Sequence, residues 1–526
     1  ETTTDDVGRF ELRLPAALVE VQVAAAGHFP LSTALDLRAA DALGAELALA
    51  RDTGFATSVE VVGASPAPAP ATETVQPTQV LRTPGALDNV FRTLQTMPGV
   101  AATEEFSSRL AVRGGAPDQN LTVMDGVEVH DPFRLFGLTS AFNPEIIQRF
   151  ELATGGFSVK YGDRLSSLLS VENRDGTRDR RLAGSGSLSI TDGNVVLEGK
   201  IPGGAPGSWL VTGRRTYYDV IAAKVTGEDF PGFADVQAKG VWEPGQGRKL
   251  TLFGLRSRQA AAFTIDEESA QGEFQDETDN DLVWTRFDTS VGARGQLHTV
   301  AAYSNTQSVF GVDAAIENTS QRSNAPSDDA FGIANVVFER ALTVQDLSLR
   351  QELAWALGKY VVEVGGEAHR LVTRLSFDIT GDRNPNAANG SSVQGGAGLP
   401  DSLLSSRRST RGGAWLQETW QVGSRGSLQA GVRVDHAGIT GETLFSPRVS
   451  GVVDLGGVTR LKAALGRYTQ SAGYEKAAQS DYVLDFTNPA VRDLESERAV
   501  QASVGIERDL GRGVLLRVGG DNKRYT

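Results

Sequence analysis

From about residue 181 onward, apolar and polar residues alternate along the chain. Clear examples are Leu428–Asp435 (LQAGVRVD), Val500–Glu507 (VQASVGIE) and Arg460–Leu465 (RLKAAL). Successive side chains of a strand point to opposite faces, so each stretch has one apolar and one polar face. The pattern predicts a long series of antiparallel strands.

The connections between these strands fall into two kinds that mostly alternate. The short ones carry turn residues: 202–208, 243–247, 292–295, 357–359, 423–426, 455–457 and 510–513. The long ones are polar: 217–232, 259–280, 307–343, 374–409 and 470–496. Brief connections near 191–193 and 440–445 are exceptions. Short turns on one side and long loops on the other are typical of outer-membrane barrels.

The strand count predicts a barrel that continues beyond this chain. We count about fifteen strands, whereas plugged transporter barrels have about 22. The chain begins at Glu1 without a signal peptide and stops inside an alternating stretch. We therefore expect a fragment that lacks the signal peptide and about seven C-terminal strands.

Composition excludes several classes of protein. The net charge is 51 − 65 = −14, which argues against a nucleic-acid binder. The absence of cysteine excludes disulfides, zinc–thiolate sites and iron–sulfur clusters. The five histidines lack metal-ligand spacing, and no nucleophile elbow, Walker A loop or HExxH motif occurs. The sequence contains no run of 18 apolar residues, so we predict no membrane-spanning helix. We predict neither an enzyme nor a cofactor.

The first 80 residues divide into a small module and a tether. Residues 1–52 hold short apolar runs at Phe10–Leu14, Leu18–Ala24 and Glu46–Ala50, which predict a small β-sandwich. Residues 53–80 contain the extended segment Val59-Glu60-Val61-Val62. It is followed by proline at every second position, which favours stiff polyproline II. The segment is either the last strand of the sandwich or a strand offered to another protein's sheet.

Residues 81–180 predict a compact α+β domain. We expect a helix over Asp88–Met97, with Val90, Phe91 and Leu94 on one face, and a helical turn at Pro144–Gln148. The strands are expected at Leu110–Arg113, Leu121–Met124, Val127–Val129 and Phe150–Ala153. Turn residues separate them, notably Arg113-Gly114-Gly115 and Asp125-Gly126.

Two further features are candidate binding elements. Segment 266–281 carries eight acidic residues and no Lys or Arg, which indicates either a solvated outer loop or a calcium site. Tyr217-Tyr218 follows two arginines at a strand–loop junction. These tyrosines are either membrane-girdle aromatics or candidate ligand-side residues.

The motifs of the second domain resemble those of a known family. PGV (98–100), VRGG (112–115), LTVMDGVEVHDPFRLFG (121–137), FNPEIIQRFELATGGFSVKYGDRLSS (142–167) and SVENRDG (170–176) are similar, in order, to the plug of TonB-dependent outer-membrane receptors. The plug-motif residues are Arg113, Gly114, Gly115, Asp125, Gly126, Asp131 and Pro132. The text at 445–470 resembles the family's barrel. Residues 1–52 resemble a carboxypeptidase regulatory-like module, as in Oar-like receptors.

The resemblance implies a mainly β architecture. We expect a partial sandwich at 1–52, a linker at 53–80 with Val59, Glu60, Val61 and Val62 as candidate TonB box, a plug at 81–180, and a transmembrane barrel at 181–526. In the family the plug blocks the barrel, held partly by ion pairs. Here Arg109 and Arg113 could pair with Glu363 or Glu367.

The implied function is an outer-membrane receptor that binds a scarce ligand at its outer face. TonB, the inner-membrane partner, would supply the energy for import. The N-terminal module and linker would lie in the periplasm, outer-membrane lipid would surround the barrel, and the ligand is not specified. The alternative is a non-transporting surface protein, an adhesin or assembly factor, on a plugged barrel.

Overall fold

In the computed structural model, strands dominate the residues that the structure describes. These are residues 18–23, 31–36, 72–86, 88–102, 108–135, 139–189, 192–217, 219, 224, 231–245, 247–267, 270–317, 333–381, 402–423, 425–456, 458–476, 495–511 and 514–525.

Two strands of the N-terminal module are described. β1 (Leu18–Val23) pairs antiparallel with β2 (Leu31–Asp36). The other two strands predicted for a sandwich, at 10–14 and 46–50, lie outside the described residues, as does the segment 59–62. The sandwich and the TonB box therefore stay predictions.

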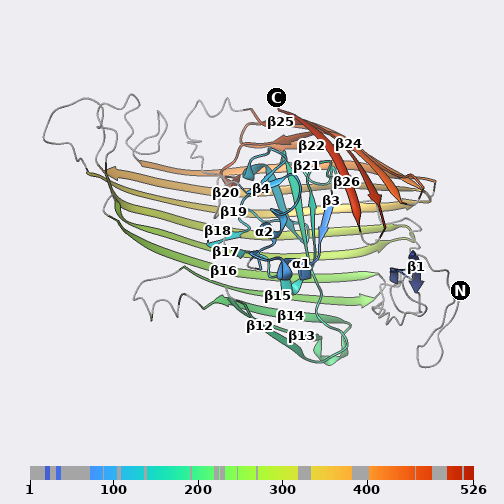
Figure 1. The fold of residues 1–526 in the computed structure, drawn as a ribbon, viewed down its shortest axis with the longest axis horizontal. Coiled ribbons are helices and arrows are strands. Elements are labelled where there is room, and N and C mark those ends of the chain that lie inside the picture. Colours follow the sequence, from blue (N-terminus) through green and yellow to red (C-terminus); the bar gives the residue numbers. More distant parts are fainter. Residues whose placement is uncertain are drawn as a thin grey trace.

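The plug, coloured blue to cyan in Figure 1, is built on a five-stranded sheet. The order of its strands is β3-β10-β11-β6-β7. Its strands are β3 (Thr72–Val75), β6 (Asn120–Met124), β7 (Val127–Glu128), β10 (Ile147–Ala153) and β11 (Ser167–Asn173). β6 and β11 run parallel, and the other pairs are antiparallel. Since β3 joins this sheet, the linker predicted over 53–80 is too long: residues from Thr72 onward belong to the plug.

Short elements complete the plug. They are α1 (Pro77–Arg82), α2 (Val90–Leu94), β4 (Val100–Ala102), β5 (Leu110–Val112), β8 (Phe133–Arg134), β9 (Thr139–Ser140) and 3-10 helices at Pro117–Gln119 and Pro144–Ile146. The predicted helix 88–97 is thus too long at both ends. The Asn89 side chain accepts from Phe91 N over 2.9 Å and starts the helix there. Val90, Phe91 and Leu94 are buried, as the pattern predicted.

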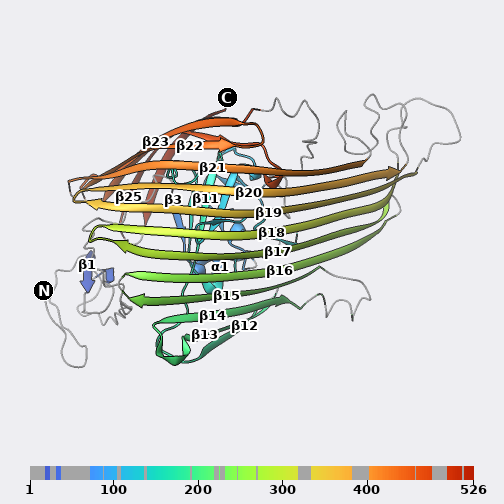
Figure 2. The same cartoon turned by 180° about the vertical axis from the view of Figure 1, so that it is seen from behind.

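Fifteen antiparallel strands in chain order form a single large sheet, which confirms the predicted barrel strands (Figures 1 and 2). Its first seven are β12 (Ala183–Leu188), β13 (Asp192–Lys200), β14 (Gly207–Thr216), β15 (Gly232–Gly245), β16 (Arg248–Glu267), β17 (Ala270–Val291) and β18 (Gly295–Glu317). The remaining eight are β19 (Ile333–Leu357), β20 (Tyr360–Gly381), β21 (Ser402–Val422), β22 (Gly426–Ala437), β23 (Glu442–Asp454), β24 (Thr459–Gln470), β25 (Glu497–Asp509) and β26 (Leu515–Tyr525).

The structure corrects the predicted acidic loop. Residues 266–281 lie almost entirely in a hairpin, because β16 continues to Glu267 and β17 begins at Ala270. Arg258 of β16 faces Asp279 of β17 at 3.7 Å across this hairpin. The connections predicted at 307–343 and 374–409 are likewise shorter than expected, because the neighbouring strands extend into them.

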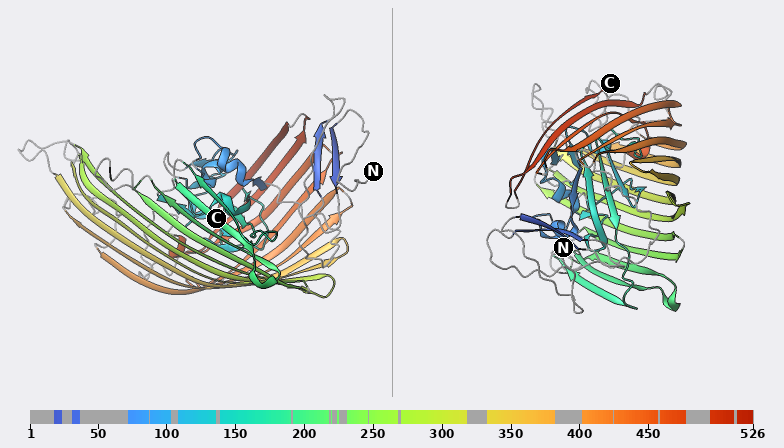
Figure 3. Two further views of the ribbon diagram at one scale, coloured as in Figure 1. Left: turned by 90° about the horizontal axis from the view of Figure 1, so that it is seen from below. Right: turned by 90° about the vertical axis from the view of Figure 1, so that its right-hand side faces the viewer.

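The sheet separates apolar from polar side chains as the alternation predicted. On β22, Val434 is 41% exposed whereas its neighbour Arg433 is 1% exposed. Figure 3 shows the sheet curved into a trough, with the plug on its concave side. The polar residues of the strands therefore face the plug, and the apolar residues face outward.

An apolar core joins the plug to the fifteen-stranded sheet, which we call the wall. Phe91, Phe142 and Phe150 of the plug belong to one buried cluster that also includes Phe253 and Trp284 of β16 and β17. The rings of Phe253 and Trp284 stack with centroids 5.3 Å apart. A second apolar contact joins Phe157 of the plug to Tyr468 of β24, whose ring centroids lie 4.8 Å apart. Polar contacts lie between these apolar patches.

Candidate functional site: the interface between plug and wall

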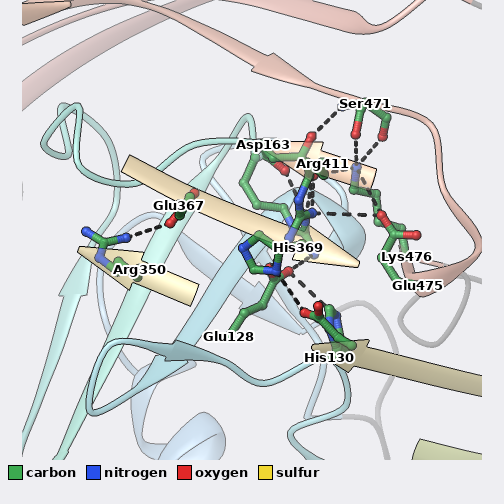
Figure 4. Close-up of polar contacts among 12 residues, drawn as sticks. Glu128, His130, Asp163, Arg350, Glu367, His369, Arg411, Ser471, Glu475 and Lys476 are labelled. Atoms are coloured by element: carbon green, nitrogen blue, oxygen red, sulfur yellow. Dashed lines mark hydrogen bonds and ion pairs between the residues drawn. The ribbon is translucent and has the colours of Figure 1, made fainter. Parts of the chain in front are cut away.

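A two-residue turn places the first site residues. Asp125 and Gly126 both have positive φ, 50° and 87°, and Met124 pairs with Val127 across them. This is the tight hairpin that the Asp-Gly pair predicted. The turn leads directly into Glu128 and His130, which point toward the wall (Figure 4).

A second plug loop supplies Asp163 and Arg164. Asp163 has a φ of 56°, and the loop leads into β11. Arg164 donates from Nη2 to Glu128 over 2.7 Å, which ties the two plug loops together. Arg164 is buried, and the Glu128 side chain is 9% exposed.

Arg411 of β21 joins both loops to the wall. Its Nη2 donates to Glu128 over 2.5 Å, and its Nη1 contacts Asp163 (Figure 4). One guanidinium therefore engages two carboxylates from different plug loops, in the fork geometry that suits arginine. We call Glu128, Asp163, Arg164 and Arg411 the Arg411 cluster.

The cluster keeps both plug carboxylates ionised. Burial by itself would raise the pKa of Glu128 and Asp163, but the neighbouring cations outweigh it. Arg411 and Arg164 hold the pKa of Glu128 well below its usual value, and Lys476 and Arg411 lower that of Asp163. Ionised carboxylates that are buried and fully paired fix geometry strongly, because losing one partner leaves an uncompensated charge.

The segment that follows β24 reaches the same cluster. Ser471 N donates to Asp163 over 2.6 Å, and Lys476 Nζ lies 2.9 Å from the Asp163 carboxylate. Burial lowers the pKa of Lys476 despite the nearby carboxylates. Because residues 471–476 begin the long connection to β25, a plug carboxylate is directly linked to the root of a loop between strands.

A second bridge uses histidines. His130 Nε2 of the plug and His369 Nδ1 of β20 lie 3.2 and 2.9 Å from the same oxygen of Asp346 on β19. Glu128 lies 3.7 Å from His130 Nδ1. Burial opposes the charged form, but Glu128 and Asp346 outweigh it and raise the pKa of His130.

Two wall arginines hold the plug backbone at 157–161. Arg448 Nη1 donates to the carbonyl oxygens of Phe157, Ser158 and Tyr161 over 3.2, 2.7 and 2.8 Å. Arg433 Nη1 donates to the carbonyl oxygen of Lys160 over 3.0 Å. Gly162 lies against Arg433, because a Cβ there would come within 2.6 Å of the Arg433 Cζ.

The ion pairs expected between plug and wall exist, but their members differ from the prediction. Lys160 pairs with Glu363 and, over 2.8 Å, with Glu352. Glu367 pairs with Arg350 and Arg433 of the wall itself. Arg113, which was expected near these glutamates, lies 3.7 Å from Asp521 of β26.

A polar cavity of about 430 Å³ lies between plug sheet and wall. Its lining comes from β10 and β11 on one side and β15–β19 on the other. The charged lining residues are Asp125, Lys160, Glu172, Asp175, Lys239, Lys249, Arg286, His298, Arg350 and Glu352. Both signs of charge occur, so the cavity suits water and polar solutes.

The predicted plug-motif residues have structural roles. Arg113 and Gly114 form a positive-φ turn, at 47° and 73°, and Gly115 packs against Ser166. Asp125 accepts from the backbone and side chain of Asn173 over 3.0 and 2.8 Å, which joins the β6–β7 turn to the end of β11.

The remaining predicted residues have local partners. Asp131 accepts from Phe133 N over 3.1 Å, and the carbonyl oxygen of Pro132 accepts from Ala141 N over 2.9 Å. Tyr217 donates from its hydroxyl to the carbonyl of Ser189 over 2.5 Å. Tyr218 lies outside the described residues.

Sequence reasoning assigned no role to Glu128, His130, Asp163 or Arg164, although all four lie inside quoted motifs. It also missed Arg411. Within the described part of the chain, no group of three or more His, Cys, Asp or Glu residues is arranged to hold a metal ion. Also among the described residues, none of the helices is long and apolar enough to cross a membrane.

Family models match both large parts of the chain. A model of the TonB-dependent receptor-like β-barrel matches residues 204–520, and one of the TonB-dependent receptor plug domain matches residues 65–166. No curated protein sequence matches.

Solved structures share the fold at low sequence identity. The siderophore receptor PirA from Pseudomonas aeruginosa is 16% identical in sequence and has a TM-score of 0.59. The match covers 87% of this chain and 75% of the PirA chain. A mutant of the ferric enterobactin receptor PfeA from the same organism is 16% identical, with coverage of 87% and 71% and a TM-score of 0.59. The copper transporter OprC is 17% identical, with coverage of 87% and 71% and a TM-score of 0.60.

The arrangement of plug and wall agrees with these matches. A sheet-based plug lies against the polar face of a long antiparallel sheet, held by buried ion pairs. The barrel model alone spans more than half of the 526 residues. This chain belongs to the TonB-dependent receptors of the outer membrane.

Proposed function

We propose that this receptor binds a scarce ligand at its outer face and imports it with energy delivered through TonB. The observation that carries the proposal is the Arg411 cluster, which links plug carboxylates to a wall strand and to residues 471–476. A ligand that moves the connection after β24 acts on Asp163 through Ser471 and Lys476. Binding outside would thereby loosen the plug.

The plug's first strand suits force transmission from the periplasm. Among the described strands, β3 is an edge strand of the plug sheet and pairs with β10 alone, from Thr72–Ala153 to Val75–Phe150. The candidate TonB box at Val59–Val62 precedes it by a short proline-rich tether. If TonB adds this segment to its own sheet, a pull on the tether peels β3 away one residue pair at a time.

The polar cavity supports a route along the wall. It lies beside β10 and β11, so displacement of the strands next to it would widen it. Its mixed charges would let a polar solute pass without one dominant binding site. The N-terminal module, which resembles carboxypeptidase regulatory-like domains in an Oar-like layout, would lie on the periplasmic side with the tether.

Ligand identity needs a direct screen. Two structural neighbours are a ferric enterobactin receptor and a copper transporter. Ferric enterobactin and Cu²⁺ are therefore the first probes for accumulation that depends on TonB. An organic polymer is the next class, because the layout resembles Oar-like receptors.

TonB coupling can be tested without knowing the ligand. The chain has no cysteine, so Val61→Cys introduces a single thiol. We expect this intact receptor to form a disulfide with a TonB that carries one cysteine in its C-terminal domain. The matched control, Ala71→Cys, lies beyond the prolines and should not react.

A deletion then separates binding from import. Removing residues 58–63 should abolish accumulation of an identified ligand and leave its binding at the cell surface intact. Equal accumulation with and without the segment would reject TonB coupling through it. Surface binding without any accumulation in the unaltered receptor would favour the non-transporting alternative.

A further inference from the structure

The outward faces of β20 and β21 change from apolar to basic along the strands. Even-numbered residues point outward on both strands: Val364 is 46% and Leu416 is 50% exposed, whereas odd-numbered neighbours are buried. Arg370 and Arg374 of β20 and Arg408 of β21 occupy the same outward face and are exposed.

The three arginines are neighbours across the two strands. Arg408 pairs with Val372, the residue midway between Arg370 and Arg374. It is therefore diagonal to both, at about 7–8 Å, which is within reach of long side chains. Among the described residues, none of the three guanidinium groups has a hydrogen-bond or ion-pair partner.

Among the residues that the structure describes, no acid lies close enough to neutralise the group. The closest outward carboxylate along β20 is Asp378, four residues beyond Arg374, or about 14 Å along the strand. Asp378 faces Glu339 of β19, so these two acids form a separate, more distant pair of like charges. Three uncompensated guanidinium groups on one surface favour an anionic partner.

An aromatic pair on the same strands sets the depth of the arginines. Tyr360 and Trp420 stack with centroids 6.1 Å apart, and Lys359 lies over both rings. Such aromatics mark the membrane interface of barrels. Tyr360 begins β20 and Trp420 lies near the end of β21, so both rings lie beside the short turns on one side of the sheet.

The arginines lie 10 to 14 residues further along these strands. At about 3.4 Å per residue and a tilt of about 45°, they are roughly 24–34 Å above the aromatics. The apolar band of a barrel is about 25 Å tall. The arginines therefore lie at the level of the headgroups of the outer leaflet.

We propose that Arg370, Arg374 and Arg408 form a docking surface for the phosphate groups of outer-leaflet glycolipid. Guanidinium forks match phosphate oxygens, and three within reach of one another can hold a bisphosphorylated headgroup. Free phosphate lacks acyl chains, whereas a glycolipid also covers Val364, Leu416 and the rest of the apolar face below. The position of the arginines above that face selects the lipid.

The test compares two triple variants of the intact receptor in detergent. Arg370→Gln, Arg374→Gln and Arg408→Gln remove the docking surface. The control carries Arg256→Gln, Arg258→Gln and Arg508→Gln, which change the same number of exposed arginines. Arg256 and Arg258 of β16 face Asp281 and Asp279. Arg508 lies near the end of β25, beside the short turn to β26.

Native mass spectrometry would measure binding of bisphosphorylated lipid A, of its dephosphorylated form and of inorganic phosphate. We expect the unaltered receptor and the control to bind the bisphosphorylated lipid equally. The docking variant should bind it at least about tenfold more weakly. The dephosphorylated lipid and inorganic phosphate should bind weakly to all three.

Heat-modifiable gel mobility confirms that each variant keeps its barrel. Equal lipid binding by the docking variant and the unaltered receptor would overturn the proposal. So would an equal loss in the control, because that would show a general effect of positive charge. Tight binding of inorganic phosphate would assign the surface to free anions instead.

Discussion

Arg411 of the wall donates to Glu128 of the plug over 2.5 Å and contacts Asp163 with its other terminal nitrogen. One side chain of β21 therefore holds two plug loops that are 35 residues apart in the chain. The wall fixes the position of these loops relative to each other as well as to itself.

Replacing Arg411 should loosen the plug. Arg411→Met leaves the buried Glu128 and Asp163 short of a cation, which should lower the free energy of unfolding of the plug by about 3–5 kcal/mol. Urea titration of the intact receptor, followed by protease access to the plug, measures this change. Arg411→Lys keeps a charge but loses the fork, so its loss should be intermediate. Equal stability of all three proteins would contradict the role of the cluster.

His130 should make plug stability depend on pH near neutrality. Its pKa is raised from 6.5 by Glu128 and Asp346, with Arg411 opposing. A raised pKa contributes stability that is present below about 6.5 and is lost as pH rises through the folded value. His130→Gln should remove this loss above pH 6.5, seen as a weaker dependence of the urea midpoint on pH. Identical profiles for the variant and the unaltered receptor would exclude this histidine as the source.

Asp175 should contribute acid sensitivity where the plug meets the wall. Burial opposes ionisation, but Lys239 and Lys249 outweigh it and lower the pKa of Asp175 from 3.8 to about 2. The stability is present above pH 4 and is lost as pH falls toward about 2. Asp175→Asn should lose about 2 kcal/mol at pH 7 and flatten the acid side of the stability curve. Urea unfolding of both proteins at a series of pH values measures this change. Because other carboxylates titrate in both proteins, the difference between their two stability curves isolates Asp175.

Gly162 should be intolerant of a methyl group for reasons of space. A Cβ would come within 2.6 Å of Arg433 Cζ, whose guanidinium is buried and bound to Asp435 over 2.7 Å. Gly162→Ala should therefore destabilise the plug by about 1–3 kcal/mol. The control is Gly213→Ala on β14, where no atom lies within 4 Å of the added carbon. A neutral Gly162→Ala would show that Arg433 is free to move.

The sequence alone predicted those strands of the wall whose outward face is apolar. Leu428–Asp435 alternates cleanly, and the structure places Val434 outward and Arg433 inward. The Asp125-Gly126 turn was also predictable, because few residue pairs accept two positive φ values. These features depend on local chemistry that a single stretch of chain carries.

The contacts of the site were not predictable in the same way. Residues 402–413 are almost entirely polar apart from two leucines, so alternation does not reveal that Arg411 faces inward and Arg408 outward. Segment 266–281 was predicted as a loop because both its faces are polar, yet residues 270–281 pair with β16 and β18 and belong to strand β17. Partners such as Asp163 and Arg411 are 248 residues apart, and only the tertiary packing of the plug against the sheet brings them together.

The most direct test of the account is a cross-link between plug and wall in outer membranes. Ser158 Oγ lies 2.6 Å from Gln417 Oε1, which faces inward, whereas Leu416 is 50% exposed on the outer face. The chain has no other cysteine, so a short thiol-to-thiol cross-linking reagent should join Ser158→Cys to Gln417→Cys within one chain, and it should not join Ser158→Cys to Leu416→Cys, whose side chain lies on the other face of the wall. Cross-linking of the Leu416 pair alone, or of neither pair, would contradict a plug held against the inner face of the wall.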